Sequence, residues 1–278
     1  MIKLPVPEFT FRQVLRKILS KMEDGKLKAK ILCNMSEFLS MEQFYTDKVN
    51  EANLYTMAPY ERQSPQTLPG DLKKNEYNSL YHNQFRRRGG RQIYDKLMAN
   101  SNEKCPYCGG IGIPNNLDHY LPLAYFPQFS ILPYNLVPSC RDCNMGGKRQ
   151  AFANAEQEQV LHPYFDDEKF FNEQWIFAYY EEGDPGVAEY FVKAPDHWSE
   201  TDKQRVKNHF EMFHISRAYS VRAAEELSTI IPTIKNFDGP DDWDLYKNSI
   251  IIPQIEHAPF MNYWKRILYQ ALLSTNLI

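Results

Sequence analysis

Four cysteines and the polar residues between them are the groups in this chain whose types and spacing could do chemistry. The cysteines form two Cys-x-x-Cys pairs: Cys105, Cys108, Cys140 and Cys143. Each pair can present two thiolates from one tight turn, and tetrahedral zinc takes four such soft ligands. Asp118 and His119 lie between the pairs, and Asn144 follows the second pair directly. The spacing therefore predicts a structural zinc site that closes a loop carrying an Asp-His pair.

The other uses of such thiols are a disulfide or a redox motif. The N-terminus lacks the basic-then-apolar layout of a secretion signal, and disulfides are rare in proteins that stay in a reducing compartment. Pro106, Gly109 and Gly110 favour a tight turn at the first pair. We therefore expect the four thiols to bind zinc. The fifth cysteine, Cys33, falls in an amphipathic helical pattern, which predicts a core thiol.

Composition is that of a folded globular protein. The chain has 278 residues, of which 43% are hydrophobic and 14% aromatic, enough for one large or two ordinary domains. No stretch approaches the roughly 20 consecutive apolar residues that a membrane helix needs. We expect a cytoplasmic protein without a membrane partner.

Charge is distributed unevenly along the chain. The net charge is −3, yet segment 86–149 holds nine Lys or Arg and four acidic residues, so it carries +5 against −8 elsewhere. A basic region on an acidic body can hold a phosphate backbone. A solvated turn is the alternative for the arginine run. The predicted phosphate contacts are Arg86, Arg87, Arg88, Arg91, Lys148 and Arg149.

Periodicity divides the chain into three regions. Residues 1–100 predict helices at 11–19, 26–50, near Leu72 and at 91–98, with a Pro-rich loop or linker at 59–70. Thr10 and Gln13 resemble a capping box for the first helix. Residues 166–278 predict a hairpin of strands 175–180 and 189–193, then helices at 199–214, 216–230 and 241–278, the last broken at Pro253 and Pro259. These outer regions are interpreted as scaffold or partner surface.

The middle region, residues 101–165, predicts strand, strand and helix in that order. Short apolar runs at 111–113 and 136–137 favour the two strands, and residues 141–152 favour the helix. The expected fold is therefore α+β and mostly α, with a central ββα unit stapled by zinc between a helical N-terminal region and an α+β C-terminal region.

The combination of these spacings resembles the HNH endonucleases, of the ββα-metal type with a four-cysteine zinc site. The resemblance covers residues 105–149 and rests on Asp118-His119, Asn135 and Cys140-x-x-Cys143-Asn144, with Lys148 behind them. Segments 91–96 and 161–166 and the C-terminal helices are also similar to a bacterial group that carries this motif between helical flanks. Members of such groups are often found beside ATPases in antiphage defence operons. The resemblance thus implies a DNA endonuclease in antiphage defence, with an ATPase or sensor protein as a further partner.

Each polar residue of the motif has an expected role. An imidazole ordinarily titrates near neutrality, so we expect His119 to take a proton from the attacking water. Asp118 and Asn144 would offer a carboxylate and an amide oxygen to Mg²⁺ or Mn²⁺. The resemblance implies a one-metal mechanism and a structural role for Asn135, whose amide would tie the loop that aims His119. His162 is a further candidate as a metal ligand or phosphate contact.

Two other functions stay open at this point. The motif does not exclude RNA or tRNA as the substrate. A non-catalytic zinc-knuckle module that binds nucleic acid or a partner would also explain the cysteines and the arginines. It would not explain Asp118, His119 and Asn144 together.

Overall fold

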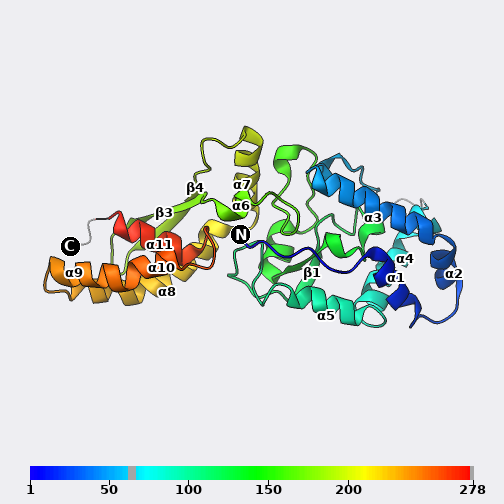
Figure 1. Cartoon of the computed structure of the whole chain (residues 1–278), viewed down its shortest axis with the longest axis horizontal. Helices are drawn as coiled ribbons and strands as arrows, with labels where there is room; N and C mark the ends of the chain where they lie inside the picture. Colours follow the sequence, from blue (N-terminus) through cyan, green and yellow to red (C-terminus); the bar gives the residue numbers. More distant parts are fainter. Residues whose placement is uncertain (62–66, 276–278) are drawn as a thin grey trace.

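Helices dominate the fold, and two small antiparallel sheets accompany them. The computed structural model describes residues 1–61 and 67–275, so part of the predicted loop at 59–70 lies outside the described residues. The predicted α+β class, mostly α, is confirmed at this level. Figure 1 shows an elongated molecule in which α6 and α7 lie between an N-terminal and a C-terminal half.

The N-terminal half begins with the predicted capping box. Thr10 accepts a hydrogen bond from Gln13 N–H at 3.3 Å, and Gln13 Oε1 accepts one from Thr10 N–H at 2.8 Å, so α1 starts at Phe11. The helices of this half are α1 (Phe11–Leu19), α2 (Lys26–Cys33), α3 (Met35–Asn50), α4 (Lys74–Ser79) and α5 (Arg91–Ala99). Helix α4 continues as the π-helix η3 (Leu80–Phe85), so 74–85 is one helical rod.

Two predictions for this half are wrong. The expected single helix at 26–50 is broken at Asn34, whose side chain donates hydrogen bonds to Lys30 O at 3.0 Å and Gly70 O at 3.2 Å. These bonds satisfy one backbone carbonyl of α2 and one of the distant turn at Gly70. Cys33 ends α2 and is exposed, so it is no core thiol.

The middle region has the predicted order of strand, strand and helix, with different bounds. Strand β1 (Asn116–His119) pairs antiparallel with β2 (Leu136–Ser139), with Asp118 opposite Val137 and His119 opposite Leu136. The predicted strand at 111–113 is wrong, because these residues complete the turn of the first cysteine pair. Cys105 N–H donates to Gly112 O at 3.0 Å.

The helix after β2 is shorter than predicted. It is the π-helix η6 (Asp142–Lys148), and Arg149 N–H donates to Asn144 O at 2.7 Å. Arg149 has a φ of 53°, which ends the helix there rather than at residue 152. A Cβ on Gly147 would lie 2.6 Å from Met212 O, so neighbouring α7 (Glu200–Met212) approaches this helix closely.

The C-terminal half is built on the predicted hairpin. Strands β3 (Ile176–Glu181) and β4 (Val187–Val192) pair antiparallel, and helices α8 (Ile215–Lys235) and α11 (Trp264–Leu273) pack against them. The remaining helices are α6 (Lys169–Asn172), α9 (Pro240–Tyr246) and α10 (Ile252–Glu256). The predicted break at Pro253 is absent, because the π-helix η8 (Lys247–Ile251) carries α9 into α10 and Pro253 lies in the first turn of α10.

Candidate functional site

The four predicted zinc ligands meet at one point. The Sγ atoms of Cys105, Cys108, Cys140 and Cys143 all lie within 4.8 Å of one another, and the side chains are buried free thiols. A tetrahedral zinc with Zn–S bonds of about 2.3 Å needs sulfurs roughly 3.8 Å apart, so the cluster could hold such an ion.

Backbone geometry builds the pocket for this ion. Gly109 and Gly110 have φ values of 60° and 81°, which glycine adopts without steric cost, and they turn the first pair. Gly112 N–H points at Cys108 Sγ at 3.4 Å, and Cys140 N–H points at Cys105 Sγ at 3.4 Å. Backbone N–H groups directed at sulfur favour thiolates, so the donor set suits a cation.

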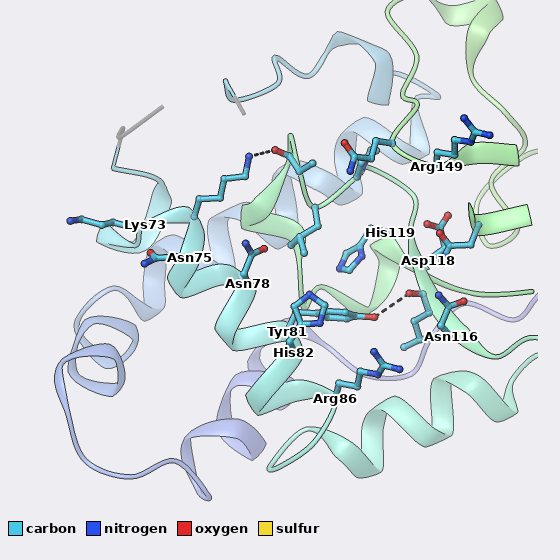
Figure 2. A pocket seen from close by; sticks show the side chains of 17 residues that line it. Lys73, Asn75, Asn78, Tyr81, His82, Arg86, Asn116, Asp118, His119 and Arg149 are labelled. Carbon is cyan, nitrogen blue, oxygen red and sulfur yellow. Dashed lines mark hydrogen bonds between the residues drawn. The ribbon is translucent and has the colours of Figure 1, made fainter. Parts of the chain in front are cut away.

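A cleft opens beside the cysteine cluster, between the rod α4–η3 and the unit β1–β2–η6. Its volume is about 810 Å³. Figure 2 shows that Asp118 and His119 face it from one side and that Asn78, His82 and Arg86 face it from the other. Asn144 and Arg149 also line the cleft. The fold thus brings three of the four predicted catalytic residues to one cavity.

His119 is held in one protonation state. Its Nε2 lies 2.9 Å from Ser130 O, and because a carbonyl only accepts, Nε2 carries the proton. Burial lowers the pKa of His119 to about 4, so the ring is neutral at pH 7 and Nδ1 keeps a free lone pair. The Tyr81 ring packs edge-on against it, with centroids 4.4 Å apart. A neutral imidazole with a defined acceptor nitrogen is what a general base requires.

Asp118 is buried beside a cation. Lys148 Nζ lies 3.1 Å from Asp118 Oδ2, yet that oxygen has no well-directed hydrogen bond within the described residues. Burial raises the pKa of Asp118, while Lys148 and the Tyr107 hydroxyl act in the opposite direction. The carboxylate is therefore costly to bury and incompletely satisfied.

Lys148 does not occupy the predicted phosphate position. Its side chain is 2% exposed, and besides the Asp118 contact its Nζ donates to His119 O at 2.6 Å. The extra residue per turn in η6 directs this side chain inward, away from the cleft. Lys148 therefore links η6 to the end of β1 and does not lie where a phosphate contact was expected.

Asn135 ties the loop between the two strands. Its Oδ1 accepts from Leu121 N–H at 2.7 Å, and its Nδ2 donates to Leu121 O at 3.1 Å and Phe129 O at 3.3 Å. Ser130 follows Phe129, so these bonds hold the carbonyl that orients His119. They are the bonds that the expected structural role of Asn135 requires.

His162 lies in the core rather than in the cleft. Its Nδ1 accepts from Tyr164 N–H at 3.2 Å, and its Nε2 lies 3.4 Å from Tyr45 Oη, which donates to Asn135 Oδ1 at 3.2 Å. Among the described residues it belongs to no cluster of potential metal ligands. The structure therefore does not bring His162 to the cleft, and His162 supports Asn135 through Tyr45.

The predicted arginines separate into two groups. Arg86 and Arg149 line the cleft. Arg87 and Arg88 line a different hollow on the other side of η3, with Ser79 and Asn83. Arg91 pairs with Asp95, Nη2 to Oδ1 at 2.7 Å, on exposed α5. Arg87, Arg88 and Arg91 are therefore not cleft contacts, because helical geometry turns successive residues to different faces.

The far wall of the cleft was missed from the sequence. Besides the predicted Arg86, the cleft-lining residues of this wall are Lys73, Lys74, Asn75, Asn78, Tyr81 and His82. The available signal was spacing, since Asn78 and His82 are four residues apart and Arg86 follows after four more. Nothing in the motif itself pointed to this helix.

Acid is expected to destabilise the fold through His162 and His209. Burial lowers the pKa of each to about 3, from 6.5 in a solvated chain. Their stabilising contribution is complete above about pH 6.5 and falls as pH drops toward 3, because only the unfolded chain then binds the two protons. These two histidines contribute a slope of roughly 3 kcal/mol per pH unit near pH 5, and His119, whose pKa burial lowers to about 4, adds to it. Urea unfolding at pH 7 and pH 5 measures it.

A single substitution separates this effect from acid release of zinc. His162→Gln leaves the cysteines untouched and should lower the slope by roughly 1.4 kcal/mol per pH unit. Equal pH dependence in this variant and in the unaltered protein would contradict the assignment of the effect to histidine.

Comparison with known proteins adds one relative. The chain is 37% identical over 289 residues to protein Ea31 of Escherichia phage lambda, and the match covers 99% of this chain and 98% of the relative. No family model matches the chain, and no solved structure does. In the part of the chain that the structure describes, no helix is long and apolar enough to cross a membrane.

Proposed function

The chain belongs to the family of the phage lambda protein Ea31, and we propose that it is a metal-dependent endonuclease of the HNH type. One observation carries the proposal. A neutral His119 with a free Nδ1 lies with Asp118 and Asn144 in one cleft, beside a cysteine cluster and within a strand, strand and helix unit. A module that only bound nucleic acid would not need a histidine held in this state.

The residues of the cleft fit a divalent cation such as Mg²⁺ or Mn²⁺. Asp118 supplies a buried carboxylate whose Oδ2 lacks a well-directed hydrogen bond, and Asn144 supplies a neutral amide oxygen. A bound ion would stabilise the negative charge that develops on the phosphate. Because Lys148 already balances Asp118, we expect weak ion binding until a phosphate adds its own charge.

The chain's own groups would handle the proton and the phosphate. His119 Nδ1 would accept a proton from the attacking water, and Ser130 O would stabilise the resulting imidazolium through Nε2–H. Arg149 and Arg86 would hold phosphates on either side of the cleft. The HNH resemblance implies products with a 5′-phosphate and a 3′-hydroxyl.

Cleavage assays with and without divalent ions test the proposal. We expect purified full-length protein to nick or cut DNA in Mg²⁺ or Mn²⁺ and to be inactive in EDTA. Parallel incubation with RNA decides between the two polynucleotides. Binding of nucleic acid without cleavage in any divalent ion would contradict the proposed nuclease activity and favour the zinc-knuckle module. The relative is itself a phage protein, so we do not extend the proposal to antiphage defence or to an ATPase partner.

A further inference from the structure

The wall opposite the motif presents groups that suit bases as well as phosphates. Asn78, His82 and Arg86 recur at four-residue steps along the rod α4–η3 and line the cleft (Figure 2). An amide and an imidazole both donate and accept hydrogen bonds, which matches base edges, whereas a guanidinium matches phosphate. The wall can therefore contact bases as well as phosphates.

The ring of His82 is available for stacking. His82 is exposed on the cleft wall, and its ring packs edge-on against Tyr81, with centroids 5.0 Å apart. Histidine is among the side chains on which unpaired bases stack. A stacked base needs an unpaired nucleotide, because a base inside a duplex already stacks on its neighbours.

The floor of the cleft is recessed. Asp118 is 4% and His119 is 9% exposed, at the bottom of a cavity of about 810 Å³. That volume is in the range of small-ligand pockets, roughly 300–1,000 Å³. A duplex, whose major groove alone is about 12 Å wide, is too broad to enter such a cavity, but a single strand can enter with its backbone and bases.

We propose that this cleft takes a single-stranded stretch of nucleic acid, with Asn78 and His82 contacting its bases and Arg86 its backbone. The proposal rests on the nuclease function and specifies the substrate class. Among the cleft residues, the basic ones are Lys73, Lys74, Arg86 and Arg149 and the acid is Asp118, so the strand enters a positive cavity. Cleavage would then occur at unpaired segments of a longer substrate.

Equilibrium binding tests the proposal apart from catalysis. Full-length His119→Ala protein would be titrated, by fluorescence anisotropy in Ca²⁺ buffer, with one short DNA sequence as single strand and as duplex, and with the matching RNA strand. We expect the single strand to bind about tenfold tighter than the duplex. The unaltered protein in buffer without added Mg²⁺ or Mn²⁺ provides the same measurement if the variant folds poorly.

The rod offers matched controls on its other face. Asn78→Ala, His82→Ala and Arg86→Ala should each weaken single-strand binding by about three- to tenfold. Asn83→Ala and Arg88→Ala, in the hollow on the far side, should change it less than about twofold. His82→Phe should restore binding lost in His82→Ala, because it restores the stacking surface.

Each outcome has a separate meaning. Equal affinity for single strand and duplex, or equal losses in the control variants, would overturn the proposal. Preference for DNA or for RNA identifies which single strand the cleft takes. Cleavage by the unaltered protein in Mg²⁺ is measured in parallel. Tight single-strand binding without any cleavage would overturn the nuclease function and leave the single-strand site in place.

Discussion

Replacement of Cys140 by serine is expected to abolish zinc binding and to unfold the middle of the protein. Cys140 directly follows β2 and lies against Gly112, so its thiol connects the second cysteine pair to the turn of the first pair. The cluster also closes the segment from Cys108 to Cys140, which holds β1, β2 and the loop between them. A structural zinc contributes about 10 kcal/mol or more of folding free energy, comparable to the whole stability of a typical domain.

Zinc content and thermal unfolding measure this effect together. We expect the Cys140→Ser protein to contain no stoichiometric zinc and to unfold without a cooperative transition, and we expect a strong chelator to produce the same state in the unaltered protein. Cys33→Ser is the matched control, because Cys33 is exposed and lies outside the cluster. A zinc-free Cys140→Ser protein with an unaltered melting temperature would show that the cysteine cluster does not stabilise the fold.

The motif was predictable because its parts are close in sequence and their chemistry is specific. Paired Cys-x-x-Cys turns have few uses in a chain of this composition, so the meeting of the four thiols could be predicted before any fold was known. Asp118, His119 and Asn144 followed from their place relative to these turns. The capping box at Thr10 and the hairpin around residues 182–186 were predictable for the same reason, since each depends on a few neighbouring residues.

The remaining features depend on contacts between distant segments. Lys148 was expected in the cleft because an ordinary α-helix would have carried it there, and the π-helix η6 turns it toward Asp118 instead. Helical periodicity does not distinguish these two forms. His162 reaches the site through Tyr45, which α3 brings to Asn135 from 90 residues away, and through its ring contact with Tyr120. The wall α4–η3 was missed because only the tertiary fold places it opposite β1.

His119 is the residue on which catalysis is expected to depend most. Among the described residues, His119 is the histidine that lines the cleft on the motif side, and Ser130 and Tyr81 hold its ring in place. Loss of a general base lowers a rate by roughly 10²–10⁴-fold. Its removal also deletes a buried ring, so a loss of activity must be separated from a loss of structure.

Two substitutions at this position make that separation. His119→Ala removes both nitrogens, whereas His119→Gln keeps an amide N–H for Ser130 O but offers no group that can take a proton. We expect DNA cleavage to fall by at least about a hundredfold in both variants, with zinc content unchanged and the melting temperature better preserved in the glutamine variant. Cleavage at an unreduced rate by a folded, zinc-loaded His119→Gln protein would show that another residue is the general base. A carboxamide cannot replace an imidazole in proton transfer at neutral pH.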